Sequence, residues 1–203
     1  MKVYQIVSNF LDSNTFVIEK GKVCFIVDCG ADLEDVAKVV KGKKVGAIFL
    51  THGHYDHSIF ALQYADYFKC KIFANKNIIE TLSDTAKNYG ENFKIADFNN
   101  FVFLENDGEI NLNGEKIEYF YCPGHSKCSN CYLIDKSLFS GDVLFYQGIG
   151  RTDLYGGDKK EMLQSLKKIK NIDFDNVYSG HDRSSEKFEQ NKNISVFERF
   201  LSR

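Results

Sequence analysis

The 203-residue sequence lacks a strong excess of charge of either sign. Its 26 lysines and arginines nearly balance its 28 aspartates and glutamates, and the formal net charge is −2. No long run of lysine or arginine occurs that could follow a phosphate backbone. The sequence therefore predicts no nucleic-acid partner.

Long apolar runs are also absent. No segment approaches the roughly 20 apolar residues that a membrane helix needs. The apolar stretch within the first nine residues is far too short for a signal peptide. We therefore expect no membrane partner and a cytoplasmic location.

Cysteine occurs six times, and the expected compartment would keep the thiols reduced. Three lie in or beside apolar runs and are interpreted as small buried residues: Cys24, Cys29 and Cys70. The other three bracket His125: Cys122, Cys128 and Cys131. The last two have C-x-x-C spacing, but no second pair completes a zinc ribbon. Ordinary reduced thiols are favoured over the alternative, a redox-responsive loop beside His125.

Proline and histidine are scarce, with one and five copies, and all of them lie in three short segments. Thr51-His52-Gly53-His54-Tyr55-Asp56-His57 holds three histidines. Pro123-Gly124-His125 holds the fourth and the single proline, and Ser179-Gly180-His181 holds the fifth. Ser140-Gly141-Asp142 adds a carboxylate in a similar setting. A structural histidine usually stands alone, so this concentration indicates a metal site.

Apolar periodicity predicts strands in groups, with helices between and after them. The expected strands are residues 3–7, 15–18, 22–27, 45–50, 71–74, 101–104, 109–112, 116–121, 132–134, 138–139 and 176–178. The expected helices are 32–40, 58–68, 77–88, 158–170 and 185–201, with Ser58 capping the second. No linker interrupts the chain, so a single domain over residues 1–203 is expected. This order predicts an α/β fold of two mixed β-sheets packed face to face, with helices on the outer faces.

The spacing of the cluster can serve two metal ions. His52 and His54 are two residues apart, so in an extended segment they point to one side and can bind one ion. Asp56 and His57 follow the turn and can reach a second ion. The expected first set is His52, His54, His125 and Asp142. The expected second set is Asp56, His57, His181 and Asp142, with Asp142 as the bridge.

Such a centre has a defined chemistry. Two divalent ions lower the pKa of a bound water towards ~7 and hold a bridging hydroxide that attacks a carbonyl. No sixth histidine exists to protonate a leaving group. Because a thiolate leaves with little protonation, thioesters suit this site better than amides.

These segments resemble the metallo-β-lactamase superfamily. The first histidine segment matches its H-x-H-x-D-H signature, and P-G-H, S-G-D and S-G-H follow in the superfamily's order, essentially from end to end. The resemblance implies an αβ/βα sandwich with a dinuclear site at one edge of the sheets. It also implies seven metal ligands: His52, His54, Asp56, His57, His125, Asp142 and His181. Val27-Asp28-Cys29-Gly30 resembles the early V-D-x-G motif, where Asp28 would support a ligand; the alternative is a turn cap.

Within the superfamily, Gly150-Arg151-Thr152-Asp153-Leu154 resembles glyoxalase II-type hydrolases, which cleave S-acyl-glutathione thioesters. Only residues 182–203 follow His181, so the resemblance is to a short, single-domain branch. Arg151 and Asp153 are interpreted either as substrate contacts or as an ion pair that stiffens the loop.

The sequence thus predicts a metal-dependent hydrolase of a small thioester, with Asp56 and Asp142 as its catalytic carboxylates. The expected cofactors are two divalent ions, zinc first, although iron or manganese also suits these ligands. The alternatives are a persulfide dioxygenase with one iron, which shares the histidine pattern and a G-R-T-D segment, and a lactonase. A non-catalytic binding module is disfavoured because no ligand position has been lost. The oligomeric state is not predicted.

Overall fold

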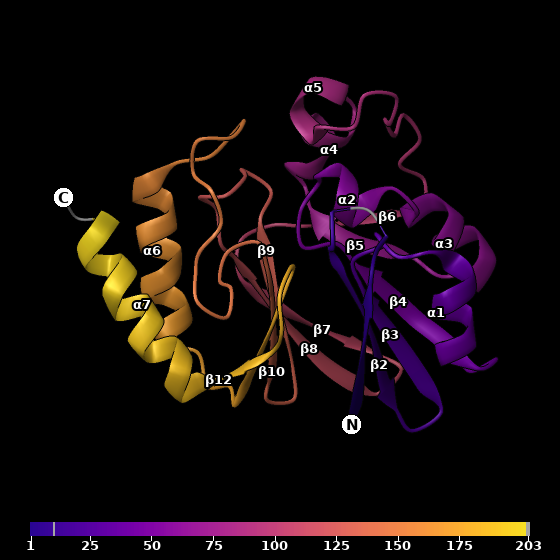
Figure 1. The fold of residues 1–203 in the computed structure, drawn as a ribbon. Helices are drawn as coiled ribbons and strands as arrows, with labels where there is room; N and C mark the ends of the chain where they lie inside the picture. The colour runs from indigo at the N-terminus through magenta and orange to yellow at the C-terminus, as the bar shows by residue number, and fades with distance from the viewer. Residues whose placement is uncertain (10, 202–203) are drawn as a thin grey trace.

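The computed structural model describes residues 1–9 and 11–201, and these form two six-stranded sheets (Figure 1). The first sheet has the order β1-β2-β3-β4-β5-β6. Its strands are β1 (Lys2–Val7), β2 (Asn14–Lys20), β3 (Val23–Val27), β4 (Lys44–Phe49), β5 (Ile72–Asn75) and β6 (Phe101–Leu104). Strands β1 to β3 pair antiparallel, whereas β3 to β6 run parallel.

The second sheet has the order β12-β11-β10-β9-β8-β7. Its strands are β7 (Gly108–Leu112), β8 (Glu115–Tyr121), β9 (Asn130–Ile134), β10 (Ser137–Gly141), β11 (Asn176–Ser179) and β12 (Ser185–Glu186). Only β10 and β11 pair parallel in this sheet. Both sheets are therefore mixed, as predicted.

The longer helices lie on the outer faces of the two sheets, and the short ones lie near the upper edge of the molecule (Figure 1). Those of the first half are α1 (Leu33–Val40), α2 (Tyr55–Ser58), α3 (Ala61–Phe68), α4 (Ile78–Leu82) and α5 (Thr85–Asn88). The second half has α6 (Lys159–Lys170) and α7 (Lys187–Leu201). Figure 1 shows α1 and α3 against the first sheet and α6 and α7 on the far side of the second. The predicted αβ/βα sandwich is confirmed.

Three groups of buried apolar residues hold the layers together. One lies between the sheets and is rich in aromatic side chains, among them Phe16, Phe49, Tyr132 and Phe139. A second joins the first sheet to α1 and α3, and a third joins the second sheet to α6 and α7. Burial of apolar surface in each layer is the main favourable contribution to this arrangement.

Some predicted helix boundaries were wrong, for local reasons. The expected helix at 77–88 is two helices, because the Asp84 carboxylate accepts the amide of Ala86 at 2.9 Å and starts α5 anew. Ser58 does not cap α3: its hydroxyl donates to the His54 carbonyl at 2.8 Å and it ends α2. Residues 185–186 form β12 rather than the first turn of α7.

The connections that carry the histidines follow strand ends. The segment with His52 to His57 follows β4, and Asp142 and His181 follow β10 and β11. His125 lies in the connection between β8 and β9. Figure 1 shows α2, which contains Asp56 and His57, at the upper edge of the first sheet. The fold therefore gathers these connections at one edge of the sandwich.

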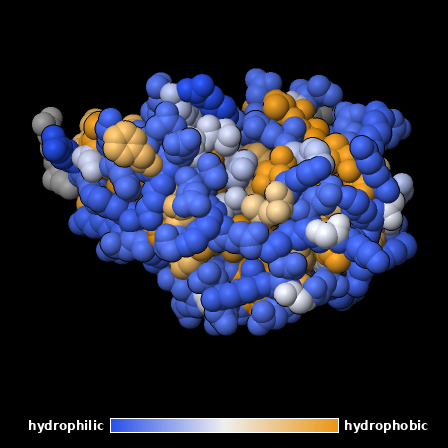
Figure 2. All heavy atoms as spheres, turned by 90° about the horizontal axis from the view of Figure 1, so that it is seen from below, coloured by the Kyte–Doolittle hydropathy of each residue, from blue (hydrophilic) through white to orange (hydrophobic). Residues whose placement is uncertain are grey.

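The opposite end of the molecule is mostly polar. Figure 2 views the molecule from below, and hydrophilic residues cover most of this face, with apolar residues in separate patches. Within residues 1–9 and 11–201, no helix has the length and apolar character needed to cross a membrane.

One hydrogen bond between the sheets gives a test of the packing. Tyr132 of β9 is fully buried, and its hydroxyl donates to the carbonyl of Leu50, which follows β4, at 2.9 Å. Tyr132→Phe leaves that buried carbonyl without this donor. We expect a loss of about 1–2 kcal/mol in the free energy of unfolding, measured as a lower urea midpoint with an unchanged slope. The exposed Tyr67→Phe serves as control; equal midpoints for the two variants would contradict the role of Tyr132.

Candidate metal centre

The first group of side chains at this edge is His52, His54 and His125, whose ligand atoms lie within 4.8 Å of one another. His54 Nδ1 is 3.1 Å from His52 Nε2 and 3.0 Å from His125 Nε2. Asp142 Oδ2 lies 3.5 Å from His125 Nε2. The structure thus brings together the whole of the predicted first set.

The second group is Asp56, His57 and His181. Asp56 Oδ2 is 3.2 Å from His57 Nε2 and 3.3 Å from His181 Nε2. Asp142 stands beside this group as well, with Oδ1 at 3.4 Å from His57 Nε2 and Oδ2 at 3.6 Å from His181 Nε2. Asp142 also forms a third group with His52 and His57, one histidine from each predicted set, so it lies between the two groups.

These distances fit metal coordination. Metal–nitrogen bonds of 2.0–2.1 Å place the ligand atoms of a tetrahedral ion roughly 3.3 Å apart. Asp142 Oδ1 is buried and, within the described residues, has no hydrogen-bond partner. An orphaned buried carboxylate oxygen among imidazole nitrogens is costly unless a cation meets it. The residues present therefore fit a pair of divalent ions.

The ring orientations are fixed from behind. His125 Nδ1 donates to the Arg151 carbonyl at 2.9 Å, and His57 Nδ1 donates to the Asp28 carboxylate at 2.9 Å. Since a carbonyl or carboxylate can only accept, the Nδ1 atoms carry the protons and the Nε2 lone pairs face the cluster. This is the tautomer that a metal ligand requires.

Burial and neighbouring charges set the protonation of the cluster. Burial lowers the pKa of His54 to about 3 and holds the pKa of His52 well below its usual range, so both rings are neutral. Burial acts in the same direction on the pKa of His57, but the carboxylates of Asp56 and Asp142 outweigh it and raise that pKa. The second group thus attracts positive charge, which bound cations would supply.

Asp28 acts through other residues. Its carboxylate accepts the Thr51 amide and the Thr51 hydroxyl, both at 2.8 Å, besides the ring of His57. Its backbone is left-handed, with φ of 60°, which an aspartate adopts at a cost. Asp28 therefore supports a predicted ligand in the manner the resemblance implied, and does more than cap a turn.

Gly180 shows how close the connections come. A Cβ atom at this position would lie 2.1 Å from Asp142 Oδ1 and 2.8 Å from His57 Cε1. Any larger residue at position 180 would push the Asp142 carboxylate out of its place between the two groups. Glycine is therefore required before His181 by contact with the cluster.

Arg151 and Asp153 form an ion pair with each other. Arg151 Nε and Nη2 donate to the two carboxylate oxygens of Asp153 at 3.0 and 2.8 Å, and this pairing lowers the pKa of Asp153 to about 2. Both side chains are more exposed than buried, at 68% and 66%. Neither belongs to the ligand groups, and the contribution of Arg151 to the centre is its backbone carbonyl.

Two residues at the centre had not been predicted. Thr51 links Asp28 to His52, since its hydroxyl also lies 3.1 Å from His52 Nδ1. Tyr89 has its ring 5.2 Å from the ring of His54, at an interplanar angle of 78°. Thr51 is the first residue of the histidine segment, and this position could have identified it as a residue of the site. Tyr89 lies in a loop between strands, and no pattern in the sequence marks it.

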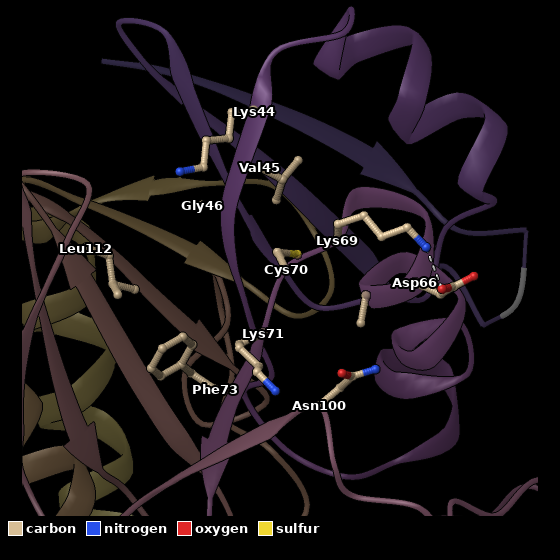
Figure 3. Close-up of a pocket in the computed structure, with 11 residues that line it drawn as sticks. Lys44, Val45, Gly46, Asp66, Lys69, Cys70, Lys71, Phe73, Asn100 and Leu112 are labelled. Atoms are coloured by element: carbon tan, nitrogen blue, oxygen red, sulfur yellow. Dashed lines mark hydrogen bonds and ion pairs between the residues drawn. The ribbon is translucent and has the colours of Figure 1, made fainter.

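Figure 3 shows a separate hollow of about 410 Å³. It lies where β4 begins, between Lys44–Gly46 and Leu112 of β7, with Lys69 and Asp66 as an ion pair at its rim. Its lining contains none of the predicted site residues. Because the histidines follow the other end of β4, this hollow does not belong to the metal centre.

The cysteines do not form a pair around His125. Cys128 packs with the first sheet's apolar group and contacts Thr81, whereas Cys131 belongs to the second sheet's group and contacts Cys122. All six cysteines are free thiols, and only Cys70 is not fully buried. The structure thus favours buried reduced thiols over a redox-responsive C-x-x-C loop.

Comparisons with known proteins agree with this geometry. The family model described as the metallo-beta-lactamase superfamily matches residues 8–181. The chain is 30% identical over 167 residues to the probable metallo-hydrolase YqgX of Bacillus subtilis, covering 77% of each chain. It is 27% identical over 169 residues to the hydroxyacylglutathione hydrolase GloC of Haemophilus influenzae, covering 79% of this chain and 80% of the relative.

Among solved structures, the BLEG-1 B3 metallo-beta-lactamase superposes with a TM-score of 0.87 at 29% identity. The match covers 97% of this chain and 99% of that one.

Asp28→Asn tests the support of His57. The amide offers one acceptor oxygen in place of two, so the His57 tautomer is no longer fixed. We expect the affinity for one of two zinc ions to fall about 10–100-fold while the other is retained, measured by competition with a chromophoric chelator. Asp153→Asn is the control. Equal weakening of both ions, or of neither, would contradict this role.

Thiol reactivity tests the interpretation of the cysteines. Burial raises the pKa of Cys70 to about 11, and the other five thiols are buried. With a chromogenic disulfide reagent near neutral pH, we expect one slow thiol in the folded protein, none in Cys70→Ser, and all six after unfolding. Rapid reaction of two thiols, or a peroxide-induced bond between Cys128 and Cys131, would count against it.

Proposed function

We propose that this chain, which belongs to the metallo-β-lactamase superfamily, is a dinuclear metal-dependent hydrolase that cleaves thioesters of the S-acyl-glutathione class. The observation that carries the proposal is the convergence of two ligand groups on Asp142. A centre with one ion needs only one of these groups. The presence of the second group, with Asp56, His57 and His181, favours a site for two ions over a mononuclear one.

In this proposal each side chain has a role. His52, His54 and His125 hold one ion, Asp56, His57 and His181 hold the other, and Asp142 lies between them. Zinc, iron and manganese all suit imidazole and carboxylate ligands, and zinc is preferred here. Such ions supply an acidified water and polarise the substrate carbonyl.

The thioester preference rests on what surrounds the reacting carbonyl. Hydrolysis forms a bond from water oxygen to the acyl carbon and breaks the carbon–sulfur bond, whose electron pair leaves on sulfur as a thiolate. The proton released from water needs an acceptor, and the candidate is the Asp56 carboxylate, whose Oδ2 lies at the cluster beside His57 Nε2 and His181 Nε2. All five histidines are ligands in this proposal, so none is left to protonate an amide nitrogen.

The named relatives support this choice in part. One relative is a hydroxyacylglutathione hydrolase, and the closely superposing structure is a B3 metallo-beta-lactamase. Hydrolysis of a β-lactam amide is therefore the second candidate, and a comparison of the two substrates must decide. The six free thiols support a reducing compartment such as the cytoplasm.

The decisive experiment measures metal content and substrate choice together. We expect protein purified without added metal to contain two ions per chain and to hydrolyse S-lactoylglutathione, detected as released thiol. Activity is lost with a strong chelator and returns with zinc. His54→Ala and His181→Ala are each expected to lose one ion and at least about 100-fold in kcat/KM, with Tyr67→Ala as an unaffected control.

Three results would overturn the proposal. One is faster hydrolysis of a chromogenic cephalosporin than of any thioester. Another is a single iron per chain with oxygen uptake on glutathione persulfide. The third is preferred hydrolysis of a lactone.

A further inference from the structure

A loop next to the metal centre brings the ring of Tyr89 against His54. Three helices end in a left-handed residue: Lys41 after α1, Lys69 after α3 and Tyr89 after α5. The two lysines point into solvent, as a left-handed cap allows. At the third, φ is 63° and the side chain is a large ring that meets His54 edge to face. The position of this tyrosine is therefore not explained by helix capping alone.

Tyr89 is held from both sides. Its hydroxyl accepts the amide of Tyr155 at 2.6 Å, in the loop that begins at Arg151. The hydroxyl of Tyr155 hydrogen-bonds to Glu80, and Lys87 pairs with Glu80 at 2.7 Å while lying over the Tyr155 ring. Tyr89 thus joins the α4–α5 segment to the loop whose first carbonyl orients His125.

The turn that follows Tyr89 is also fixed. Asn88 is fully buried, its Nδ2 donates to the Phe93 carbonyl at 2.9 Å, and its Oδ1 accepts the Gly90 amide at 2.7 Å. A Cβ atom on Gly90 would lie 2.6 Å from Cδ2 of Tyr55, so the turn packs directly on that ring. Because Tyr55 is the residue after His54, this turn is placed against the metal centre.

A pocket of about 520 Å³ lies beside this turn. Its walls are largely aromatic or aliphatic, with Tyr55, Ile59, Tyr89 and Phe93 around it. Tyr55 and Phe93 meet edge to face at 5.7 Å. Glu91 is the only charged residue in the lining, and it is a carboxylate.

We propose that this pocket is a subsite for the acyl part of the substrate, that it takes an uncharged alkyl or aryl group, and that Tyr89 is its specificity-determining wall. The inference rests on the proposed function, because the reacting carbonyl must lie at the metal cluster. Tyr55 and Tyr89 line the pocket, and the ring of Tyr89 meets that of His54 at 5.2 Å, so the pocket adjoins the edge of the cluster. The carboxylate of Glu91 and the absence of a cation in the lining disfavour anionic acyl groups.

The alternative is that Tyr89 only braces the two loops. Tyr89→Phe and Tyr89→Ala separate these roles, since the first removes the hydrogen bond from Tyr155 and keeps the ring. Phe93→Ala enlarges the pocket without touching His54. Asn92→Trp, at an exposed position of the rim, narrows its entrance and should leave folding intact. Tyr67→Ala is the matched control, an exposed tyrosine on α3.

The readout is the ratio of kcat/KM for a phenylacetyl thioester to that for the acetyl thioester of the same thiol. We expect the ratio to fall about tenfold in Phe93→Ala, Tyr89→Ala and Asn92→Trp, and to stay at the wild-type value in Tyr89→Phe and Tyr67→Ala. A uniform loss on both substrates in all Tyr89 and Phe93 variants would show bracing alone and overturn the subsite.

A binding measurement keeps the two proposals distinguishable. Phenylacetamide is neutral and carries no thioester, and its binding to the metal-loaded protein is followed by ligand-observed NMR. We expect wild type and Tyr67→Ala to bind it and Asn92→Trp to bind at least about tenfold more weakly. If wild type cleaves no thioester but shows this pattern, the proposed function fails and the apolar pocket stands. Absence of binding to wild type overturns the pocket itself.

Discussion

The structure depends on one constraint: two carboxylates and five imidazoles must lie within 3.0–3.6 Å of a neighbour while most of them are buried. Buried polar atoms so crowded are costly unless each meets a partner of opposite character. The chain satisfies this with ligands from both halves of the sandwich. The connection after β4 supplies four, and connections of the second sheet supply His125, Asp142 and His181. The centre therefore forms only when the two sheets are packed together.

Hydrogen bonds behind the ligands make the arrangement specific. Asp28 orients His57, and the Arg151 carbonyl orients His125. Thr51 hydrogen-bonds to Asp28 and lies beside the ring of His52. Asp28 and Thr51 follow the ends of β3 and β4, which are rigid platforms, whereas Arg151 lies in the connection between β10 and α6. The ligand atoms are consequently directed at common points before any cation arrives, and little rearrangement is needed to bind one.

The fold class and the seven clustered residues could be predicted because short, glycine-punctuated motifs carry them, and such motifs specify both residue type and backbone path. Other features could not be predicted. The break between α4 and α5 depends on a cap at Asp84, which competes with helix periodicity. The C-x-x-C spacing was ambiguous because its two cysteines enter different apolar groups, Cys128 from the connection before β9 and Cys131 from β9 itself. Tyr89 reaches His54 through tertiary packing that no local pattern records.

The connection between β5 and β6, which contains α4, α5 and Tyr89, supplies none of the seven clustered residues. It touches the centre only through side chains. Changes of length or composition there leave the spacing of the clustered residues intact. The metal-site residues and the choice of substrate can therefore change separately in evolution. The seven clustered residues lie in four connections, and the proposed acyl subsite lies mainly in a fifth.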